Sequence, residues 1–439
     1  MFNKLANAMS SFVRKFLPDA FVIAIGLTLL TMVLGIVVEG KSIVEMIDFW
    51  GGGFWAFLSF AMQMALVLVT GIVLADIPIV HKMLDKMASV PKTPAQAYIM
   101  TFLVSAAAYY INWGLAVVVG AIFARAVHKR MKNVDFPLLI ASAYVATATF
   151  PGGLSSSVAL LIATPGHFLE DTIGLVPTSQ TIFHYSNLII LAGMIIATVV
   201  AIKLMVPKEV VVVDNVEPKE EKEEIKETIS EPSTPAQKIE NSFILALLIG
   251  LVGLFFVIKY FAGGGELNLN IINMAFLCLG IILHGSPIKV ANAFKDAGFV
   301  VTPIMLQFPF YAGIMGMLSG SGLAATLASG FVALASAKTF PIFTYWSAGL
   351  VNILAPSAGG QWGIQGPLQI AAGMEIGVKP SVVAMAVGWG DAWTNTIQPF
   401  WALPILALAG LKIRDIMGYC IVIGLSIGIV TSILMYFVY

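Results

Sequence analysis

The chain has 439 residues, of which 59% are hydrophobic and 11% are charged, and its 24 basic and 24 acidic side chains give a formal net charge of zero. A soluble domain would carry roughly a quarter charged residues, so this composition excludes an ordinary soluble protein. Without net positive charge, a nucleic-acid partner is not expected. Many stretches reach the roughly 18 apolar residues that cross a bilayer, and we expect an all-α, multi-pass membrane protein.

The first half of the chain begins with an amphipathic pattern and continues as a series of apolar runs. Residues 1–16 repeat large apolar side chains at helical intervals beside three basic residues, which predicts a short helix on the membrane surface. The next run is too long for the core of a signal peptide and lacks a small-residue cleavage site, so we expect it to be retained. Apolar spans are predicted at about 17–38, 53–75, 95–112, 114–127, 137–165 and 183–206.

A polar segment divides the chain in two. Residues 207–240 hold ten acidic residues, five lysines and four prolines, a composition that cannot bury a core and predicts a solvated acidic linker. The spans on either side would form two transmembrane units, residues 17–206 and 241–439. In the second unit, apolar spans are predicted at about 242–262, 270–284, 299–318, 341–355, 363–374, 381–411 and 415–438.

Three short motifs recur in the same order in the two halves, which indicates an internal repeat. The paired motifs lie 244, 240 and 239 residues apart in the chain. Two such repeats in one membrane chain are typical of secondary carriers. The pairs are Met62-Gln63-Met64 with Leu306-Gln307-Phe308, Ile111-Asn112 with Val351-Asn352, and Leu154-Ser155-Ser156-Ser157 with Trp393-Thr394-Asn395-Thr396.

The distribution of basic residues predicts how the two repeats are oriented. Loops 76–94 and 125–135 carry seven lysines and arginines, whereas the corresponding loops 319–340 and 373–380 carry only Lys338 and Lys379. Because basic residues favour cytoplasmic loops, the first pair should be cytoplasmic and the second pair outside. This arrangement places the N-terminus and the linker in the cytoplasm and the C-terminus outside, and it makes the repeats inverted.

Four polar or glycine-rich segments interrupt the apolar runs, and we expect them to form one binding site. They are Tyr110–Gly114, Pro151–Ser157, Asn352–Gly363 and Gly388–Thr396. Irregular backbone at membrane depth is tolerated only around a protected cavity. The free N–H groups of a restarting helix favour an anion, while exposed carbonyls, hydroxyls and amides can hold a cation.

The predicted substrate-binding residues come from all four segments. They are Asn112, Ser155, Ser156, Ser157, Asn352, Ser357, Gly359, Gly360, Gln361, Trp362, Thr394, Asn395 and Thr396. The alternative is that these small residues only allow helices to pack closely. Trp113, Trp362, Trp389 and Trp393 are equally compatible with lining a cavity and with a position at the membrane interface.

Asp391 is the one acidic residue set within an interrupted span. An acid at this depth is costly and marks a functional site, so we predict that Asp391, with Gly390 and Asn395, couples transport to Na⁺ or H⁺. A Na⁺ ion would lie near Ser156 and Asn395. The alternative is that Asp391 caps a restarted helix. Phosphate-binding and dinucleotide-binding motifs are missing from the sequence, so no cofactor besides the coupling ion is expected.

Several of these stretches resemble the bacterial short-chain fatty acid transporter family. They are Phe16–Val22, Ala61–Gly71, Gly152–Ser157 and Pro356–Gly363. More distantly, the chain is similar to the superfamily of ion-coupled carboxylate carriers. That resemblance implies two inverted repeats with re-entrant hairpins and broken helices. It also implies paired motifs that bind Na⁺ and carboxylate, here Ser155–Ser157 and Thr394–Thr396, although serine stands where the superfamily often has asparagine in the first motif.

The sequence therefore predicts a carrier in the bacterial inner membrane that imports a monocarboxylate such as butyrate or acetoacetate by cation symport. The spans offer no mid-membrane lysine or arginine, and a dicarboxylate would need more donors. A carrier of another organic anion such as a dicarboxylate, a channel and a membrane-embedded enzyme are the alternatives. By analogy with related carriers, a homodimer is expected.

Overall fold

The computed structural model describes residues 18–207, 234–354, 357–398 and 401–439, and every regular element in these ranges is a helix. The prediction of an all-α membrane fold is confirmed. The surface helix predicted at 1–16 and most of the predicted linker lie outside the described residues. The last part of that linker forms the short helix α12 (Pro235–Glu240), whose residues are all exposed.

The predicted apolar runs are helical, and the structure adds helices at 43–53, 78–87, 287–297 and 323–334, where no span was predicted. In the first half the helices are α2 (Ala20–Glu39), α3 (Ile43–Gly53), α4 (Leu58–Ala75), α5 (Pro78–Met87), α6 (Pro94–Ile111), α7 (Trp113–Arg130), α8 (Phe136–Val145), η1 (Ala146–Gly152), α9 (Ser157–Ile162), α10 (Glu170–Ile173), η2 (Thr178–Gln180) and α11 (Tyr185–Leu204). In the second half, after α12, they are α13 (Phe243–Ala262), α14 (Leu269–His284), α15 (Pro287–Ala297), η3 (Gly298–Val301), α16 (Thr302–Ser321), α17 (Leu323–Leu334), α18 (Phe340–Leu354), α19 (Ala358–Glu375), α20 (Pro380–Asn395), α21 (Ala402–Ala409) and α22 (Ile413–Val438).

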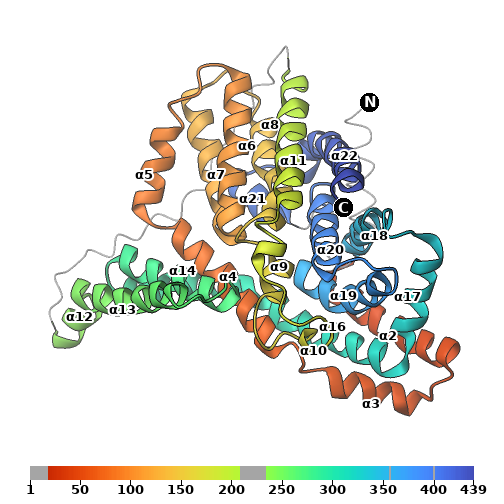
Figure 1. The fold of residues 1–439 in the computed structure, drawn as a ribbon. Coiled ribbons are helices and arrows are strands. Elements are labelled where there is room, and N and C mark those ends of the chain that lie inside the picture. Colours follow the sequence, from red (N-terminus) through yellow and green to blue (C-terminus); the bar gives the residue numbers. More distant parts are fainter. Residues whose placement is uncertain (1–17, 208–233, 355–356, 399–400) are drawn as a thin grey trace.

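The order of the helices repeats along the chain. Each helix from α3 to α9 has a counterpart from α15 to α21 that begins 244 to 246 residues later, since α3 begins at 43 and α15 at 287, while α6 begins at 94 and α18 at 340. The first helices of each half pack on the other half. Helices α2 and α3 lie against α16, and α14 and α15 lie against α4 (Figure 1). The two halves therefore share one core.

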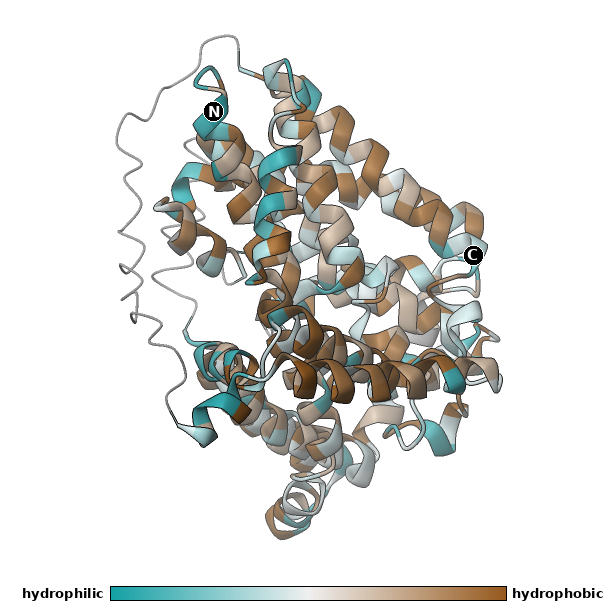
Figure 2. Cartoon of the chain, turned by 90° about the vertical axis from the view of Figure 1, so that its left-hand side faces the viewer, coloured by the Kyte–Doolittle hydropathy of each residue, from teal (hydrophilic) through white to brown (hydrophobic). Residues whose placement is uncertain are grey.

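Seven helical segments in the described ranges are long and apolar enough to cross a membrane by length and composition. They are Phe21–Glu39, Leu58–Ala75, Phe136–Ile162, Tyr185–Leu204, Pro235–Ala262, Pro287–Ser321 and Ile413–Val438. Helix α13 exposes most of its apolar side chains. Figure 2 views the molecule from the side of α13, and hydrophobic residues, in brown, run along the helices that face the viewer. Such a face fits contact with lipid chains rather than water.

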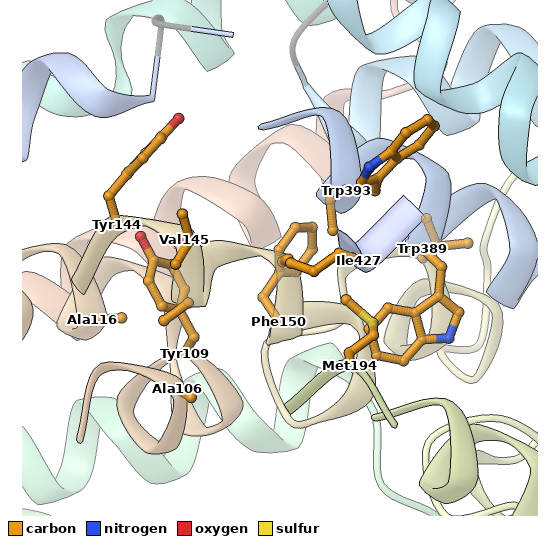
Figure 3. Packing of buried hydrophobic residues seen from close by; sticks show 14 of the residues in the cluster. Ala106, Tyr109, Ala116, Tyr144, Val145, Phe150, Met194, Trp389, Trp393 and Ile427 are labelled. Atoms are coloured by element: carbon orange, nitrogen blue, oxygen red, sulfur yellow. The ribbon is translucent and has the colours of Figure 1, made fainter. Parts of the chain in front are cut away.

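The segment Phe136–Ile162 differs from these outer helices because almost all of its residues are buried. It forms the centre of the molecule, and aromatic side chains fill the space around it. Figure 3 shows Phe150 between Tyr109 and Tyr144 on one side and Trp389 and Trp393 of α20 on the other. The hydroxyl of Tyr144 donates to the backbone carbonyl of Asn395, so packing and hydrogen bonding both join the broken segments of the two halves.

Candidate functional site

Two helical hairpins turn at equivalent positions in the two halves. Asn112 has extended backbone between α6 and α7, and its side-chain oxygen accepts the N–H of Leu115 at 3.0 Å. Ser357 precedes α19 in the same way and accepts the N–H of Gly360 at 3.3 Å. By helix order, Asn112 therefore corresponds to Ser357. The sequence pairing of Asn112 with Asn352 is wrong in this respect, because Asn352 lies inside α18.

The first predicted helix break is confirmed. Helix α8 tightens into the 3₁₀ segment η1, the chain then runs without regular structure, and α9 begins at Ser157. Pro151 lies in that 3₁₀ segment. It cannot donate a backbone hydrogen bond, and its ring disfavours a continuous α-helix at this point.

The second break lies later in the chain than the glycines predicted. Helix α20 continues through Gly388 and Gly390 to Asn395, and the irregular stretch follows. Here glycine serves close packing, since a Cβ atom on Gly390 would lie 2.2 Å from the backbone oxygen of Tyr345. The pairing of Ser155–Ser157 with Thr394–Thr396 therefore joins residues that do not occupy equivalent places in the two helix orders.

All four predicted segments contribute to one cavity, with about 620 Å³ of empty space, a volume that includes open solvent. Trp113 lines it from the first hairpin, Ser157 from the start of α9, and Ser357 with Gly359 from the second hairpin. Asp391 and Asn395 line it from the last turns of α20. The structure thus brings together one or more residues from each segment that the sequence singled out.

Asp391 is the most unusual group in this cavity. Its side chain is 1% exposed, and one carboxylate oxygen has no hydrogen-bond partner among the described residues. The other lies 3.5 Å from the amide nitrogen of Asn395, a long contact. Because Asp391 lies inside α20, the helix-cap alternative is wrong. A buried carboxylate without a paired base must carry a proton or hold a cation nearby.

An oxygen-rich cluster includes the backbone carbonyl of Asp391. The amide nitrogen of Asn352 is 2.8 Å from the backbone oxygen of Asp391, 2.8 Å from the side-chain oxygen of Asn395 and 2.9 Å from the hydroxyl of Thr394. An amide group has two N–H donors for these three acceptors. Hydroxyl, amide and carbonyl oxygens are the ligands of hard cations. The described residues contain no cluster of three His, Cys, Asp or Glu side chains that would hold a transition metal.

The other predicted site residues surround the cavity without lining it. Ser155 and Ser156 are buried in the first break, and the hydroxyl of Ser155 has no partner among the residues that the structure describes. The structure places Ser157, rather than Ser156, on the cavity that also holds Asn395. The remainder pack within or beside α19 and α20: Gly360 against the ring of Tyr311, Gln361 and Trp362 in the interior, Gly390 against α18, and Thr396 donating to the backbone oxygen of Trp393.

The four tryptophans separate into two groups. Trp113 lines the cavity, where its ring meets that of Trp401 at 5.7 Å between centroids. Trp362 and Trp389 are completely buried, and Trp393 stacks on Tyr345 at 5.0 Å. These three belong to the helix packing around the site.

Sequence reasoning missed most of the apolar wall of the cavity. The missed lining residues are Met64, Tyr109, Val117, Thr147, Phe150, Ile304, Phe308, Ala358 and Trp401. Met64 and Phe308 carried a usable signal, because both belong to the first repeated motif. Ala358 lies inside the predicted segment Asn352–Gly363, and the others stand in apolar runs and look like any core residue.

Comparison with known proteins gives the family. The model of the family described as "Short chain fatty acid transporter" matches residues 1–438. A curated relative from Escherichia coli K12 is 40% identical over 98% of both chains, and one from Haemophilus influenzae is 38% identical over 96% of both. The names of both contain "short-chain fatty acid transporter". The chain therefore belongs to the short-chain fatty acid transporter family, as its sequence resemblance implies.

Two solved structures share the fold. The YdaH transporter of Alcanivorax borkumensis is 15% identical, with a TM-score of 0.61 over 96% of this chain and 98% of its own. MtrF of Neisseria gonorrhoeae, described in its report among antimetabolite efflux pumps, is 14% identical, with a TM-score of 0.52 over 98% and 97% of the two chains. At these identities the likeness concerns the fold alone. Together with the seven apolar segments, the family assignment makes the chain a multi-pass membrane protein.

Proposed function

We propose that this member of the family imports a short-chain monocarboxylate together with a cation across the bacterial inner membrane. The observation that carries the proposal is the meeting of four helix interruptions around a cavity whose described lining residues include one buried, unpaired carboxylate, Asp391, and no basic side chain. The names of the two close relatives support the substrate class.

The substrate carboxylate would be held by helix ends. Helices α7 and α19 each begin at a hairpin tip, and their first residues, Trp113 and Ala358, line the cavity. Each helix has 18 residues, so its N-terminus carries a positive dipole end and free N–H groups. The apolar wall around Phe150 and Phe308 would accept a short alkyl chain. A second carboxylate would meet no basic side chain here, which favours a monocarboxylate over a dicarboxylate.

The cation would be held on the α20 side of the cavity. Asp391 supplies the negative charge, and its backbone oxygen, the hydroxyl of Thr394 and the side-chain oxygen of Asn395 gather around the amide nitrogen of Asn352. This set suits Na⁺ directly, and Asp391 alone suits H⁺. A cation next to the substrate would also neutralise its carboxylate, which no fixed basic residue does.

The grouping of the loops supports the proposed orientation. Residues from 180–186, 337–341, 377–382 and 438–439 line one pocket, so the loops expected outside lie at one end of the molecule. The two basic loops are joined to each other, because the guanidinium of Arg130 donates two hydrogen bonds to the carboxylate of Asp85 at 2.7 and 2.8 Å. This guanidinium holds the pKa of the Asp85 carboxyl below its usual range. We place the basic loops in the cytoplasm and the repeats in inverted orientation.

The remaining expectations complete the proposal. The transmembrane units are residues 17–206 and 241–439, residues 1–16 lie on the cytoplasmic membrane surface, and residues 207–240 form a cytoplasmic linker. The second chain of a homodimer and the lipid bilayer are the expected partners besides the substrate. A cysteine replacing Lys129 should be protected from an impermeant thiol reagent in intact cells, while one replacing Lys379 should react. Equal labelling of the two positions would contradict the inverted arrangement.

Transport is tested with purified protein in proteoliposomes under separately imposed Na⁺ and pH gradients. Labelled butyrate should accumulate under one of the two gradients and exchange with internal butyrate when neither is present. Inhibition by succinate as strong as by unlabelled butyrate would move the substrate class to dicarboxylates. A single-channel current without saturation or exchange would mean that the protein is a channel.

A further inference from the structure

A second cavity opens at the end of the molecule that gathers the connections of both halves. It encloses about 1700 Å³, a volume that includes open solvent. Its walls come from the segment before α11, the α17–α18 connection, the α19–α20 connection and the end of α22. Three of its side chains can carry positive charge, Lys338, Lys379 and His184, and no acidic side chain is among the lining residues. Tyr439, the last residue of the chain, also lines the cavity and carries the terminal carboxylate, so the lysines give this surface its excess of positive charge.

Both lysines come from loops that are otherwise without basic residues. Lys338 and Lys379 are the only basic residues in 319–340 and 373–380, and both line this same cavity. Neither is in an ion pair among the described residues, whose two salt bridges involve Arg130 and Arg414. The ammonium of Lys338 lies 5.3 Å from the centre of the Tyr436 ring, a contact that positions the charge without neutralising it.

The cavity wall is connected to the central site through one side chain. The amide nitrogen of Asn187 donates to the backbone oxygen of Ile182 at 2.8 Å and lies 3.5 Å from that of Gly152 in the first break. Its side-chain oxygen accepts the indole N–H of Trp389 at 3.1 Å. Ser186, the neighbour of Asn187, lines the cavity. Asn187 thus holds together the cavity wall, the first break and the helix that carries Asp391.

We infer that this cavity is the outer vestibule of the transporter and that Lys338 and Lys379 form a capture site for the carboxylate anion on its way to the central cavity. The inference rests on the proposed function. Two unpaired positive charges in a concave surface raise the local concentration of an anion, and salt weakens the effect. For two exposed lysines we expect an enrichment of about threefold to tenfold at low ionic strength.

The potential in the vestibule can be measured without any transport. A cysteine at Ala337, an exposed lining residue, would be reacted with a sulfonate-bearing methanethiosulfonate and with its trimethylammonium counterpart, while native Cys278 and Cys420 stay buried. In intact cells, the two lysines should raise the ratio of the anionic to the cationic reaction rate. K338Q/K379Q should therefore lower this ratio threefold or more. The K338R/K379R variant should keep the ratio of the unmutated lysines, and 1 M salt should lower the ratio to that of K338Q/K379Q. A ratio that the Gln variant leaves unchanged, or protection of the cysteine in intact cells, overturns the inference.

Transport kinetics supply the second test. K338Q/K379Q should raise the apparent KM for external butyrate about threefold to tenfold at low salt and leave the maximal rate unchanged. The matched control K82Q/K86Q removes two lysines from loop 76–94 and should leave KM unchanged. If the K338Q/K379Q protein transports butyrate with an unaltered KM, the capture site is contradicted and the proposed function is not. Failure of the unmutated protein to transport any monocarboxylate contradicts the proposed function, and the labelling ratio then still decides whether the vestibule attracts anions.

Discussion

The two halves of the molecule repeat the same helices but bring different chemistry to the cavity. The first half supplies Tyr109, Trp113, Thr147, Phe150 and Ser157, a largely aromatic wall with three hydroxyls. The second half supplies the carboxylate of Asp391 and, through Asn395 and its neighbours, a cluster of oxygens. A repeated scaffold therefore need not repeat its ligands: both halves contribute to the apolar wall, since the second half adds Ile304, Phe308 and Trp401, and we assign cation coupling to the second half.

The two hairpins also differ in polarity. In α18–α19, glutamines one turn apart link the two arms: Gln361 donates to the backbone oxygen of Ala348 at 2.9 Å, and Gln365 donates to Ser347 at 2.9 Å. In α6–α7, small residues bring the arms together, and a Cβ atom on Gly120 would lie 3.1 Å from the hydroxyl of Ser105, which itself has no partner. These hydrogen bonds of Gln361 and Gln365 fix the register of the two arms of the second hairpin, and so they fix the position of its tip in the cavity.

The largest effect is expected at Asp391. Asp391→Asn keeps the size of the side chain and removes the charge, so gradient-driven accumulation should be lost while butyrate exchange is retained. Both are measured in the same reconstituted protein. The matched change in the first half, Ser157→Ala, should alter the apparent KM for butyrate and preserve accumulation. Loss of accumulation in Ser157→Ala alone would reverse the assignment of the two halves.

The next largest effect separates two glycines of α20 that look alike in the sequence. Gly390→Ala places a methyl group against the backbone of α18 and should destabilise the protein by about 1–3 kcal/mol, as overpacking does in other cores. Gly388→Ala meets its nearest atom at 3.6 Å, an ordinary contact, and should be tolerated. Thermal unfolding in detergent compares the two variants. Equal destabilisation would contradict this distinction and would favour the sequence prediction that both glycines interrupt the helix.

A smaller effect distinguishes the two asparagines. Asn352→Ala removes the donor shared by Asp391, Thr394 and Asn395, and apparent cation affinity should fall about tenfold, the size of a lost hydrogen bond. Asn112→Ala removes a helix cap and a 2.8 Å bond to the backbone of Val67, so about 0.5–2 kcal/mol of stability should be lost without a change in cation dependence. Cation titration of uptake, with stability measured in parallel, decides between these outcomes.

The smallest effect concerns the hairpin arms. Gln365→Ala leaves the hydroxyl of Ser347 without this donor and the amide nitrogen of Gln361 without this acceptor, so stability should fall by about 1 kcal/mol. Ser105→Ala in the first hairpin removes an unpaired hydroxyl and should be neutral or stabilising. Unfolding midpoints measure both. A larger loss from Ser105→Ala would show that the first hairpin also depends on polar contacts.

Much of the fold could be predicted because it follows from composition and periodicity. The apolar runs give the helices, and Pro151 with the serines after it gives the first break. The second break could not be placed, because glycine signals both unwinding and close packing, and only the position of Tyr345 shows which applies at Gly390. The equivalence of Asn112 with Ser357 was hidden for a related reason, since a cap is defined by backbone geometry that different side chains can satisfy.

The cavity could be predicted in its polar part alone. Asp391 and Asn395 stand out from an apolar run, whereas Phe150 and Trp401 do not. Whether an aromatic residue faces a cavity or a neighbouring helix depends on the tertiary packing of segments far apart in the chain. Trp113 and Trp389 show this, since one lines the cavity and the other is wholly buried.

The most direct test of the division between the halves is the number of cations moved with each butyrate. Substrate-driven cation uptake, as ²²Na⁺ or as proton flux, is measured against labelled butyrate in proteoliposomes that contain the unmutated protein, Asp391→Asn or Ser157→Ala. We predict a fixed ratio in the unmutated protein, the same ratio in Ser157→Ala despite a changed KM, and no butyrate-driven cation movement in Asp391→Asn. Cation movement at the unmutated ratio in Asp391→Asn would contradict the account.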